Sequence, residues 1–224
     1  MDKNLNNLLK WSIENSAPST GVTAVDSNTS SGPQEQSTRT LDPEILAALL
    51  GGPSEAELMR AAMEVITDPT TDLDNKLIAF DNFEQLIESL DNANNLEPLA
   101  LWSPLISLLG HEEQELRRMA AWCVGTAVQN NVRSQERLLA MGGIPHLVGL
   151  ATREEEPAPV RRKAIYALSS AVRNYQPAMD VATAELKKNG QDHGKGDKVD
   201  ATDMNLVDEI MEWLKQRVAE AAKV

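Results

Sequence analysis

An internal repeat is the feature that most constrains the fold of this chain. Residues 116–130 (LRRMAAWCVGTAVQN) align without a gap with residues 160–174 (VRRKAIYALSSAVRN), at a constant offset of 160 − 116 = 44. In both copies the apolar residues recur at the spacing of an amphipathic helix. A weaker copy lies another 44 residues upstream, where Ile78 matches Trp122 and Asn82 matches Thr126. A fixed period of this length predicts stacked helical units, each of which buries its apolar face on its neighbours.

Shorter segments between the long helices repeat as well. Residues 102–108 (WSPLISL) pair with residues 144–150 (IPHLVGL). A period in the low forties with three helices per unit is typical of armadillo repeats. Only 4% of the residues are aromatic, and β-branched residues do not alternate in runs, so a sheet is not expected. We therefore predict an all-α fold, an armadillo-type right-handed α-solenoid of about three repeats with N-terminal helices and a C-terminal capping helix.

The apolar pattern divides the chain into five segments. We expect a short amphipathic helix over residues 1–14 and a disordered, Ser/Thr/Gly-rich linker over residues 15–40. The helical repeats are expected over residues 41–190, followed by a polar glycine-rich loop over 191–202. An amphipathic helix over residues 203–224 is expected to cover the open end of the solenoid, as terminal units must.

Charge and apolar content exclude several classes of partner. The net charge is −13, from 21 basic and 34 acidic residues, and this field repels both nucleic acid and anionic membranes. Every apolar run is far shorter than the ~20 residues that a membrane span needs. The single cysteine, Cys123, lies in an apolar segment, and we predict that it is a buried, unpaired residue. These features favour a cytoplasmic, monomeric protein.

No arrangement of residues in the sequence indicates catalysis. The three histidines, His111, His146 and His193, have no second ligand type at metal-binding spacing. Residues 194–198 (GKGDK) lack the strand, the glycine spacing and the hydroxyl residue of a phosphate-binding loop. We therefore expect no cofactor, no metal and no enzymatic activity, which leaves the surface of the solenoid as the functional feature.

The long helices carry amides and hydroxyls opposite their apolar stripes, and such groups suit a specific protein interface because they form directional hydrogen bonds. Asn130 and Asn174 have a second interpretation, in which they only end their helices. The run 91–95 (DNANN) is poor in helix formers, so it is either a tight loop or a recognition edge. The positions predicted to face away from the apolar stripe are Asn82, Gln85, Ser89, Thr126, Gln129, Asn130, Ser170, Arg173 and Asn174.

Several segments in order along the chain resemble a known family. These are LLKWSI (8–13), LLGG (49–52), KLIAFDNFE (76–84), LDNANN (90–95) and GTAVQNN (125–131). They resemble the fungal Fes-type proteins, which are armadillo-repeat nucleotide exchange factors for cytosolic 70-kDa heat-shock chaperones. The resemblance runs from residue 5 to residue 190 outside the linker, and the chain departs from longer relatives after Gly190.

The resemblance implies a mechanism and a set of contacts. The concave face would wrap one lobe of the chaperone's nucleotide-binding domain and open it, so that ADP leaves, ATP enters and the client is released. The apolar Leu8, Leu9 and Ile13 would allow the N-terminal helix to engage the chaperone as well. The residues of this chain that the resemblance places at the chaperone contact are Asn82, Ala93, Asn94, Asn95, Gln129, Asn130, Arg173 and Asn174.

Two other functions remain open for an armadillo-type chain. Nuclear-import adaptors carry a ladder of Trp and Asn four residues apart on successive long helices. In this chain the corresponding pairs are Ile78/Asn82, Trp122/Thr126 and Tyr166/Ser170, and no pair has both members, which disfavours the capture of basic peptides. A scaffold that joins two partners without exchange activity is the second alternative.

Overall fold

The computed structural model describes most of the repeat region. Its described residues are 53–191, 194, 196 and 198–221. The expected helix at 1–14, the linker at 15–40 and the start of the repeat region lie outside these residues. The helices described below all belong to one unit, Glu55–Val224.

Within the described residues the chain forms α-helices and one short 3-10 helix, and it contains no strand. The elements are α3 (Glu55–Thr67), α4 (Leu73–Ile87), α5 (Leu90–Asn95), α6 (Trp102–Ser107), η1 (Leu108–Gly110), α7 (Gln114–Val128), α8 (Val132–Ala140), α9 (Gly143–Thr152), α10 (Ala158–Val172), α11 (Gln176–Lys188) and α12 (Met204–Ala221).

The structure confirms the repeat. Helices α7 and α10 are each 15 residues long and begin 158 − 114 = 44 residues apart. Each follows two shorter helices, α5–α6 before α7 and α8–α9 before α10. Helix α4 begins 114 − 73 = 41 residues before α7, so the third copy keeps the order of helices with a slightly shorter spacing. The predicted all-α, armadillo-type solenoid is therefore confirmed.

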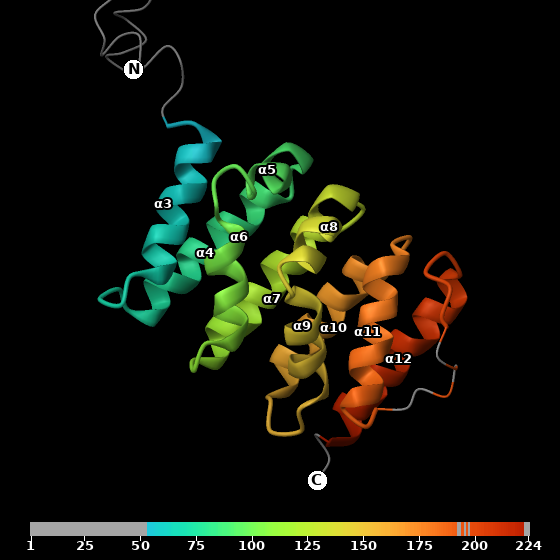
Figure 1. Cartoon of the computed structure of the whole chain (residues 1–224). Helices are drawn as coiled ribbons and strands as arrows, with labels where there is room; N and C mark the ends of the chain where they lie inside the picture. Colours follow the sequence, from blue (N-terminus) through green and yellow to red (C-terminus); the bar gives the residue numbers. More distant parts are fainter. Residues whose placement is uncertain (1–52, 192–193, 195, 197, 222–224) are drawn as a thin grey trace, which may run out of the picture. The chain divides into compact units, whose positions relative to one another are not determined.

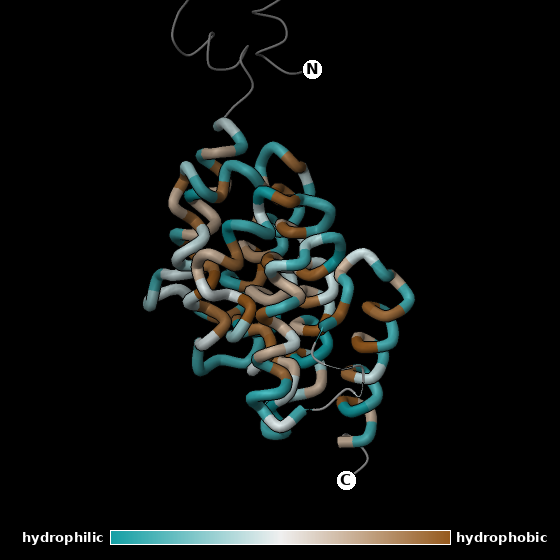
Figure 2. Tube along the Cα trace, turned by 45° about the vertical axis from the view of Figure 1, so that its right-hand side comes forward, coloured by the Kyte–Doolittle hydropathy of each residue, from teal (hydrophilic) through white to brown (hydrophobic). Residues whose placement is uncertain are grey.

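The helices form two stacked series, one of long helices and one of short helices. The long helices α4, α7, α10 and α12 each pack against the next one in the chain, and the shorter helices α5, α8 and α11 do the same. Figure 1 shows this succession from α3 to α12. Figure 2 shows the hydrophobic residues gathered between the helices, while the turns are largely hydrophilic. Each unit therefore buries its apolar face on its neighbours, as the repeat pattern predicts.

The long helices α7 and α10 end in the same way. Asn130 and Asn174 follow them, again 174 − 130 = 44 residues apart, with φ angles of 52° and 55°. Asparagine adopts this left-handed conformation more readily than most residues, because its side chain can hydrogen-bond locally. The structure thus supports the helix-ending interpretation of both residues, whereas their role as partner contacts stays a prediction.

In the last unit, the described residues between α11 and α12 form no helix. Helix α11 ends at Lys188, and Gly190 turns the chain with a φ of 69°. The Asn174 N–H donates to the Ala201 carbonyl, and the Gln176 amide bonds the backbone at both Val199 and Ala201. The segment before α12 is therefore attached to the start of α11.

Helix α12 packs on α10 and covers that end of the solenoid. Its buried face follows a helical spacing, as the amphipathic pattern of the sequence predicts. The buried residues of α12 are Val207, Ile210, Met211, Leu214 and Val218.

A buried ion pair joins the start of α7 to the loop before α10. The Arg117 guanidinium lies 2.6 Å from the Glu156 carboxylate, whose side chain is only 7% exposed. The same guanidinium donates to the carbonyls of His111 and Glu112. Removal of one partner of such a pair leaves the other charge poorly compensated, which costs far more than the loss of a surface pair.

We expect Glu156→Ala to lower the free energy of unfolding by about 2–3 kcal/mol, because Arg117 then keeps only its two carbonyl acceptors. The neighbouring Glu155 is exposed, so Glu155→Ala is the matched control and should change stability by less than about 0.5 kcal/mol. Urea unfolding followed by circular dichroism measures both. Equal midpoints for the two variants would contradict the structural role of the pair.

Candidate partner-binding surface

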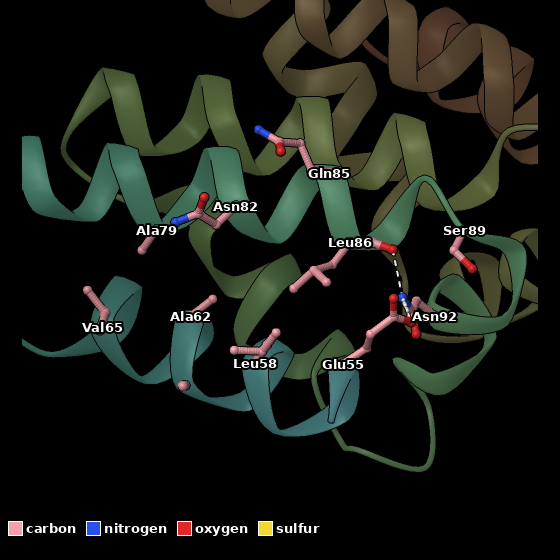
Figure 3. Close-up of a pocket in the computed structure, with 11 residues that line it drawn as sticks. Glu55, Leu58, Ala62, Val65, Ala79, Asn82, Gln85, Leu86, Ser89 and Asn92 are labelled. Carbon is pink, nitrogen blue, oxygen red and sulfur yellow. Dashed lines mark hydrogen bonds between the residues drawn. The ribbon is translucent and has the colours of Figure 1, made fainter. Parts of the chain in front are cut away.

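We call the exposed side of the long helices α4, α7, α10 and α12 the long-helix face, and we describe three hollows that its described residues line. The first is the α3–α4 groove, with a volume of about 610 Å³. Its walls are mostly apolar, from Leu58 and Val65 on α3 to Leu86 on α4. At one end the Asn92 amide donates to the Glu55 carboxylate at 2.8 Å and to the Leu86 carbonyl at 2.9 Å (Figure 3). The polar residues along the α4 side of the groove are Asn82, Gln85 and Ser89.

The second hollow, the central pocket, lies where α4, α7 and α10 meet and has a volume of about 440 Å³. Its lining is mostly polar, in contrast to the α3–α4 groove. Two aromatic residues from equivalent repeat positions, Trp122 and Tyr166, form part of its wall. The residues that line the central pocket are Glu84, Glu88, Trp122, Thr126, Gln129, Asn130 and Tyr166.

Hydrogen bonds hold the side chains of the central pocket in place. The Thr126 hydroxyl donates to the Glu84 carboxylate at 2.7 Å and so connects α7 to α4. The Tyr166 hydroxyl donates to the Gln129 amide oxygen at 3.1 Å and connects α10 to the end of α7. A partner that binds here meets side chains that are already ordered, so less conformational entropy is lost on binding.

A lysine lies over the aromatic residues of the pocket. The Lys163 ammonium is 3.7 Å from the centroid of the Trp122 ring and 5.7 Å from that of Tyr166. Burial lowers the pKa of Lys163, and the nearby charge of Arg118 lowers it further, while Glu84 acts in the opposite direction. The cation and the two rings stabilise one another, so the aromatic wall of the pocket is held in a defined orientation.

Gly125 explains how Tyr166 reaches this position. A Cβ atom at Gly125 would lie 2.5 Å from Cε1 of Tyr166 and 3.1 Å from Cα of Ala167. Glycine therefore lets α10 approach α7 closely and lets the Tyr166 ring lie across the α7 backbone.

The third hollow, the C-terminal pocket, lies between α10 and α12 and has a volume of about 520 Å³. Tyr166 lines both this pocket and the central pocket, so the two are adjacent on the long-helix face. Charged side chains of both signs dominate the lining. The residues are Arg162, Ile165, Tyr166, Ser169, Arg173, Asp208, Glu209, Met211, Glu212 and Lys215.

The predicted contact residues are distributed over these hollows. Asn82 lies in the α3–α4 groove, Gln129 and Asn130 lie in the central pocket, and Arg173 lies in the C-terminal pocket. Asn174 is exposed beyond the end of α10 and lines none of the three hollows. The structure thus brings four of the predicted residues to one face, with Asn82 on α4 and the other three just after the ends of α7 and α10.

The run 91–95 differs from the expectation of a tight loop, because it forms most of helix α5. Ala93 is only 2% exposed and packs in the core, so its side chain is not part of the surface, and an Ala93→Arg change would disturb packing. Asn94 and Asn95 are half-buried, and the Asn94 amide oxygen has no hydrogen-bond partner among the described residues. Ser170 was also expected on the exposed side, but it is buried between the helices.

Sequence reasoning missed the central part of the surface. The sequence pattern places Trp122 and Tyr166 at the positions of a Trp–Asn ladder and does not mark Glu84 as a surface residue. The repeat itself carries a signal for these two residues, because an aromatic residue recurs at an offset of 166 − 122 = 44. In the first copy, the side of the helix that carries Trp122 also carries Thr126 and Gln129. Glu84 gave no such signal, because only the packing of α4 against α7 brings it to Thr126.

The comparisons with known proteins agree with this architecture. A family model described as "Nucleotide exchange factor Fes1" matches residues 5–96, and one described as "SIL1/FES1/HPBP1 C-terminal domain" matches residues 92–188. The chain is 59% identical to the Neurospora crassa protein "Hsp70 nucleotide exchange factor fes-1", with 99% of this chain and 100% of that protein covered. The chain belongs to the Fes1 family.

Other Fes1 relatives differ in length. The Gibberella zeae protein "Hsp70 nucleotide exchange factor FES1" is 58% identical, with 98% of this chain and 99% of the relative covered. The Saccharomyces cerevisiae protein of the same name is 42% identical over 83% of this chain, but the match covers only 60% of that longer protein. The departure from longer relatives expected after Gly190 is consistent with this difference.

A solved structure shows the same fold at low sequence identity. The crystal structure of an engineered protein superposes with a TM-score of 0.50 and 16% identity, over 79% of this chain and 71% of that one. At this identity the likeness concerns the fold alone.

Within the described part of the chain, no group of three or more His, Cys, Asp or Glu residues could hold a metal ion. The same residues include no helix that combines the length and apolarity needed to cross a membrane. Cys123 is fully buried, and burial raises the pKa of its thiol well above the ordinary value. A thiol in this state is a poor nucleophile.

We expect Gly125→Ala to displace the Tyr166 ring and break its hydrogen bond to Gln129, with a loss of about 1–3 kcal/mol in stability. Gly110→Ala is a suitable control, because a Cβ atom at Gly110 has no neighbour within 4 Å. Thermal unfolding and the near-ultraviolet circular dichroism spectrum report the change. A Gly125→Ala variant with wild-type stability and spectrum would show that the ring accommodates the methyl group.

Asn130→Gly separates the two roles of Asn130. Glycine keeps the left-handed turn, so stability should change by no more than a few tenths of a kcal/mol, but the amide is removed from the central pocket. Weaker partner binding with unchanged thermal unfolding supports a contact role. Binding equal to wild type would leave Asn130 with its role in the turn alone.

Proposed function

We propose that this protein is a nucleotide exchange factor for Hsp70, which binds the chaperone's nucleotide-binding domain through the long-helix face and accelerates ADP release. Membership of the Fes1 family supports this, because relatives that match nearly the whole chain are named Hsp70 nucleotide exchange factors. The proposal includes a cytosolic location, the absence of catalytic activity, and ATP rebinding with client release after ADP leaves.

Exchange of this kind needs no chemistry from the exchange factor. It needs only that the long-helix face binds the open, ADP-free chaperone more tightly than the closed, ADP-bound form. The difference between the binding free energies for the two forms is the free energy by which this protein weakens ADP binding. By reciprocity, ADP must weaken the binding of this protein to the chaperone by the same factor.

The observation that carries the proposal is the central pocket, where Trp122 and Tyr166 face the surface from successive long helices. Tryptophan and tyrosine are the residues most often found at the energetic centre of protein interfaces. The pocket is pre-organised by Lys163 and by hydrogen bonds to Glu84 and Gln129. Such a surface can resist deformation while it displaces a lobe of the partner.

The central pocket also weighs against a nuclear-import function. Trp122 and Tyr166 would stand at the Trp positions of a peptide-binding ladder, but the Asn positions hold Thr126, which bonds Glu84, and the buried Ser170. No asparagine is thus available at either position to hold the backbone of an extended peptide. A scaffold without exchange activity remains the alternative that an exchange assay must decide.

Exchange is measured by loading Hsp70 with fluorescent ADP and adding excess unlabelled ATP with or without this protein. Nucleotide release should accelerate at stoichiometric protein. In a separate titration, ADP should weaken the complex by the same factor by which the protein weakens ADP binding. Complex formation without faster release would favour the scaffold function.

Trp122→Ala should weaken chaperone binding by about 2 kcal/mol, or roughly 30-fold, if Trp122 is a centre of the interface. Val132→Ala is the control, because Val132 is 53% exposed on α8 and lines none of the three hollows. Circular dichroism checks that both variants remain folded. A folded Trp122→Ala variant with the affinity of Val132→Ala would remove the central pocket from the interface.

A further inference from the structure

We propose that Arg173 acts on chaperone binding indirectly, by fixing α12 beside α10 so that α12 forms the last part of the partner-binding surface and presents its charged edge to the chaperone. This inference rests on the proposed function. It assigns α12 a contact role in addition to that of an end cap, and it assigns Arg173 a positioning role in place of the direct contact predicted from the sequence.

The position of α12 is that of a further long helix. It packs against α10 as α10 packs against α7 and α7 against α4. It differs from the other long helices in that the described residues directly before it form no short helix. The series of long helices, and with it the long-helix face, therefore continues without interruption from α4 to α12 (Figure 1).

The C-terminal pocket joins α12 to the rest of this face. Tyr166 forms part of the wall of both the central and the C-terminal pocket, so a partner surface seated on Trp122 and Tyr166 reaches α12 next. Met211 and Ile165 form the apolar floor of the C-terminal pocket, and charged side chains form its rim. A polar rim around an apolar centre is the usual anatomy of a protein interface.

Arg173 is engaged within the chain through its whole guanidinium group. Nε donates to the Ser169 hydroxyl at 3.1 Å, Nη1 lies 3.4 Å from the Met204 sulfur, and Nη2 pairs with the Asp208 carboxylate. Ser169 lies on α10, whereas Met204 and Asp208 lie in the first turns of α12. The side chain therefore spans the gap between the two helices at the beginning of α12, where no short helix supports it.

The exposed edge of α12 determines which partner surface fits. Asp208 is 64% exposed and Glu212 is 59% exposed, one turn apart on the rim of the pocket. Lys215 is the only cation that α12 adds to this rim, and its ammonium is 3.7 Å from Glu212. Arg162 and Arg173 line the same pocket and offset these carboxylates, so the rim fits a chaperone surface that carries charges of both signs. Ion pairs across such a rim steer association in a salt-dependent manner.

A charge swap tests the positioning role. Arg173→Ala and Asp208→Ala should each lower the affinity for Hsp70 by about two- to fivefold, the range expected for an exposed ion pair. The two changes together should cost no more than either alone, because both remove the same pair. The double change Arg173→Asp with Asp208→Arg should restore affinity toward wild type. Hydrogen exchange of the α12 amides in the free protein should rise in the single variants and fall again in the swap.

Two results would overturn the positioning role. If Arg173→Ala weakens binding while Asp208→Ala does not, and the swap fails to rescue, then Arg173 contacts the chaperone directly. If the two single variants, the double alanine variant and the swap all bind like wild type, the pair has no effect on the interface.

Glu212→Lys tests the contact role of α12 itself. It should weaken Hsp70 binding, and the loss should shrink at high salt. Glu136→Lys, at an exposed position of α8 outside the three hollows, is the matched control with the same change in charge. Equal affinities for the two variants would exclude α12 from the interface. Trp122→Ala and the exchange assay test the proposed function separately. If the wild-type protein accelerates ADP release but Glu212→Lys leaves the affinity unchanged, only the contact role of α12 is rejected.

Discussion

The close packing of successive long helices is the interaction on which the rest of the structure depends. At the contact between α7 and α10 the residues at the closest approach are small, because Gly125 lies against the Tyr166 ring and close to the Cα atom of the fully buried Ala167. Small residues let helix backbones approach closely, and each long helix then serves as the apolar surface on which the next one packs. Because no unit has a core of its own, the stability of every unit is coupled to that of its neighbours.

The same packing creates the candidate interface. Once the apolar stripes of α4, α7, α10 and α12 are buried between the helices, their remaining sides form one long face. Side chains from different units then meet across it, as Thr126 meets Glu84 and Tyr166 meets Gln129. A surface built from rigid helices and ordered side chains is suited to displacing part of a partner, since little of the binding free energy is spent on ordering the surface itself.

Much of this fold could be predicted from the sequence because the information is local and periodic. The offset of 44 residues between the long helices and the amphipathic face of α12 both follow from residue spacing. The predicted surface was less accurate. Gln129 and Arg173 lie in hollows of the long-helix face as expected, but Ala93 is in the core, and Trp122 and Tyr166 were not identified as part of the surface. The run around Ala93 misled the prediction because its weak helix formers are held in α5 by tertiary contacts, such as the bonds of Asn92 to Glu55 and Leu86.

The sequence by itself determined the class of fold, the number and order of the helices in each repeat, and the family, because periodicity and ordered motifs are properties of the chain alone. Only the tertiary structure decided which polar residues share a pocket. Glu84 and Thr126 are 42 residues apart, and Arg173 and Asp208 are 35 apart, yet each pair is in direct contact. The distance between two side chains on neighbouring repeats depends on how closely their helices pack, and that is set by side-chain volumes at the buried contact, as Gly125 shows. Through this packing, the exposed positions that recur along the sequence form one continuous face.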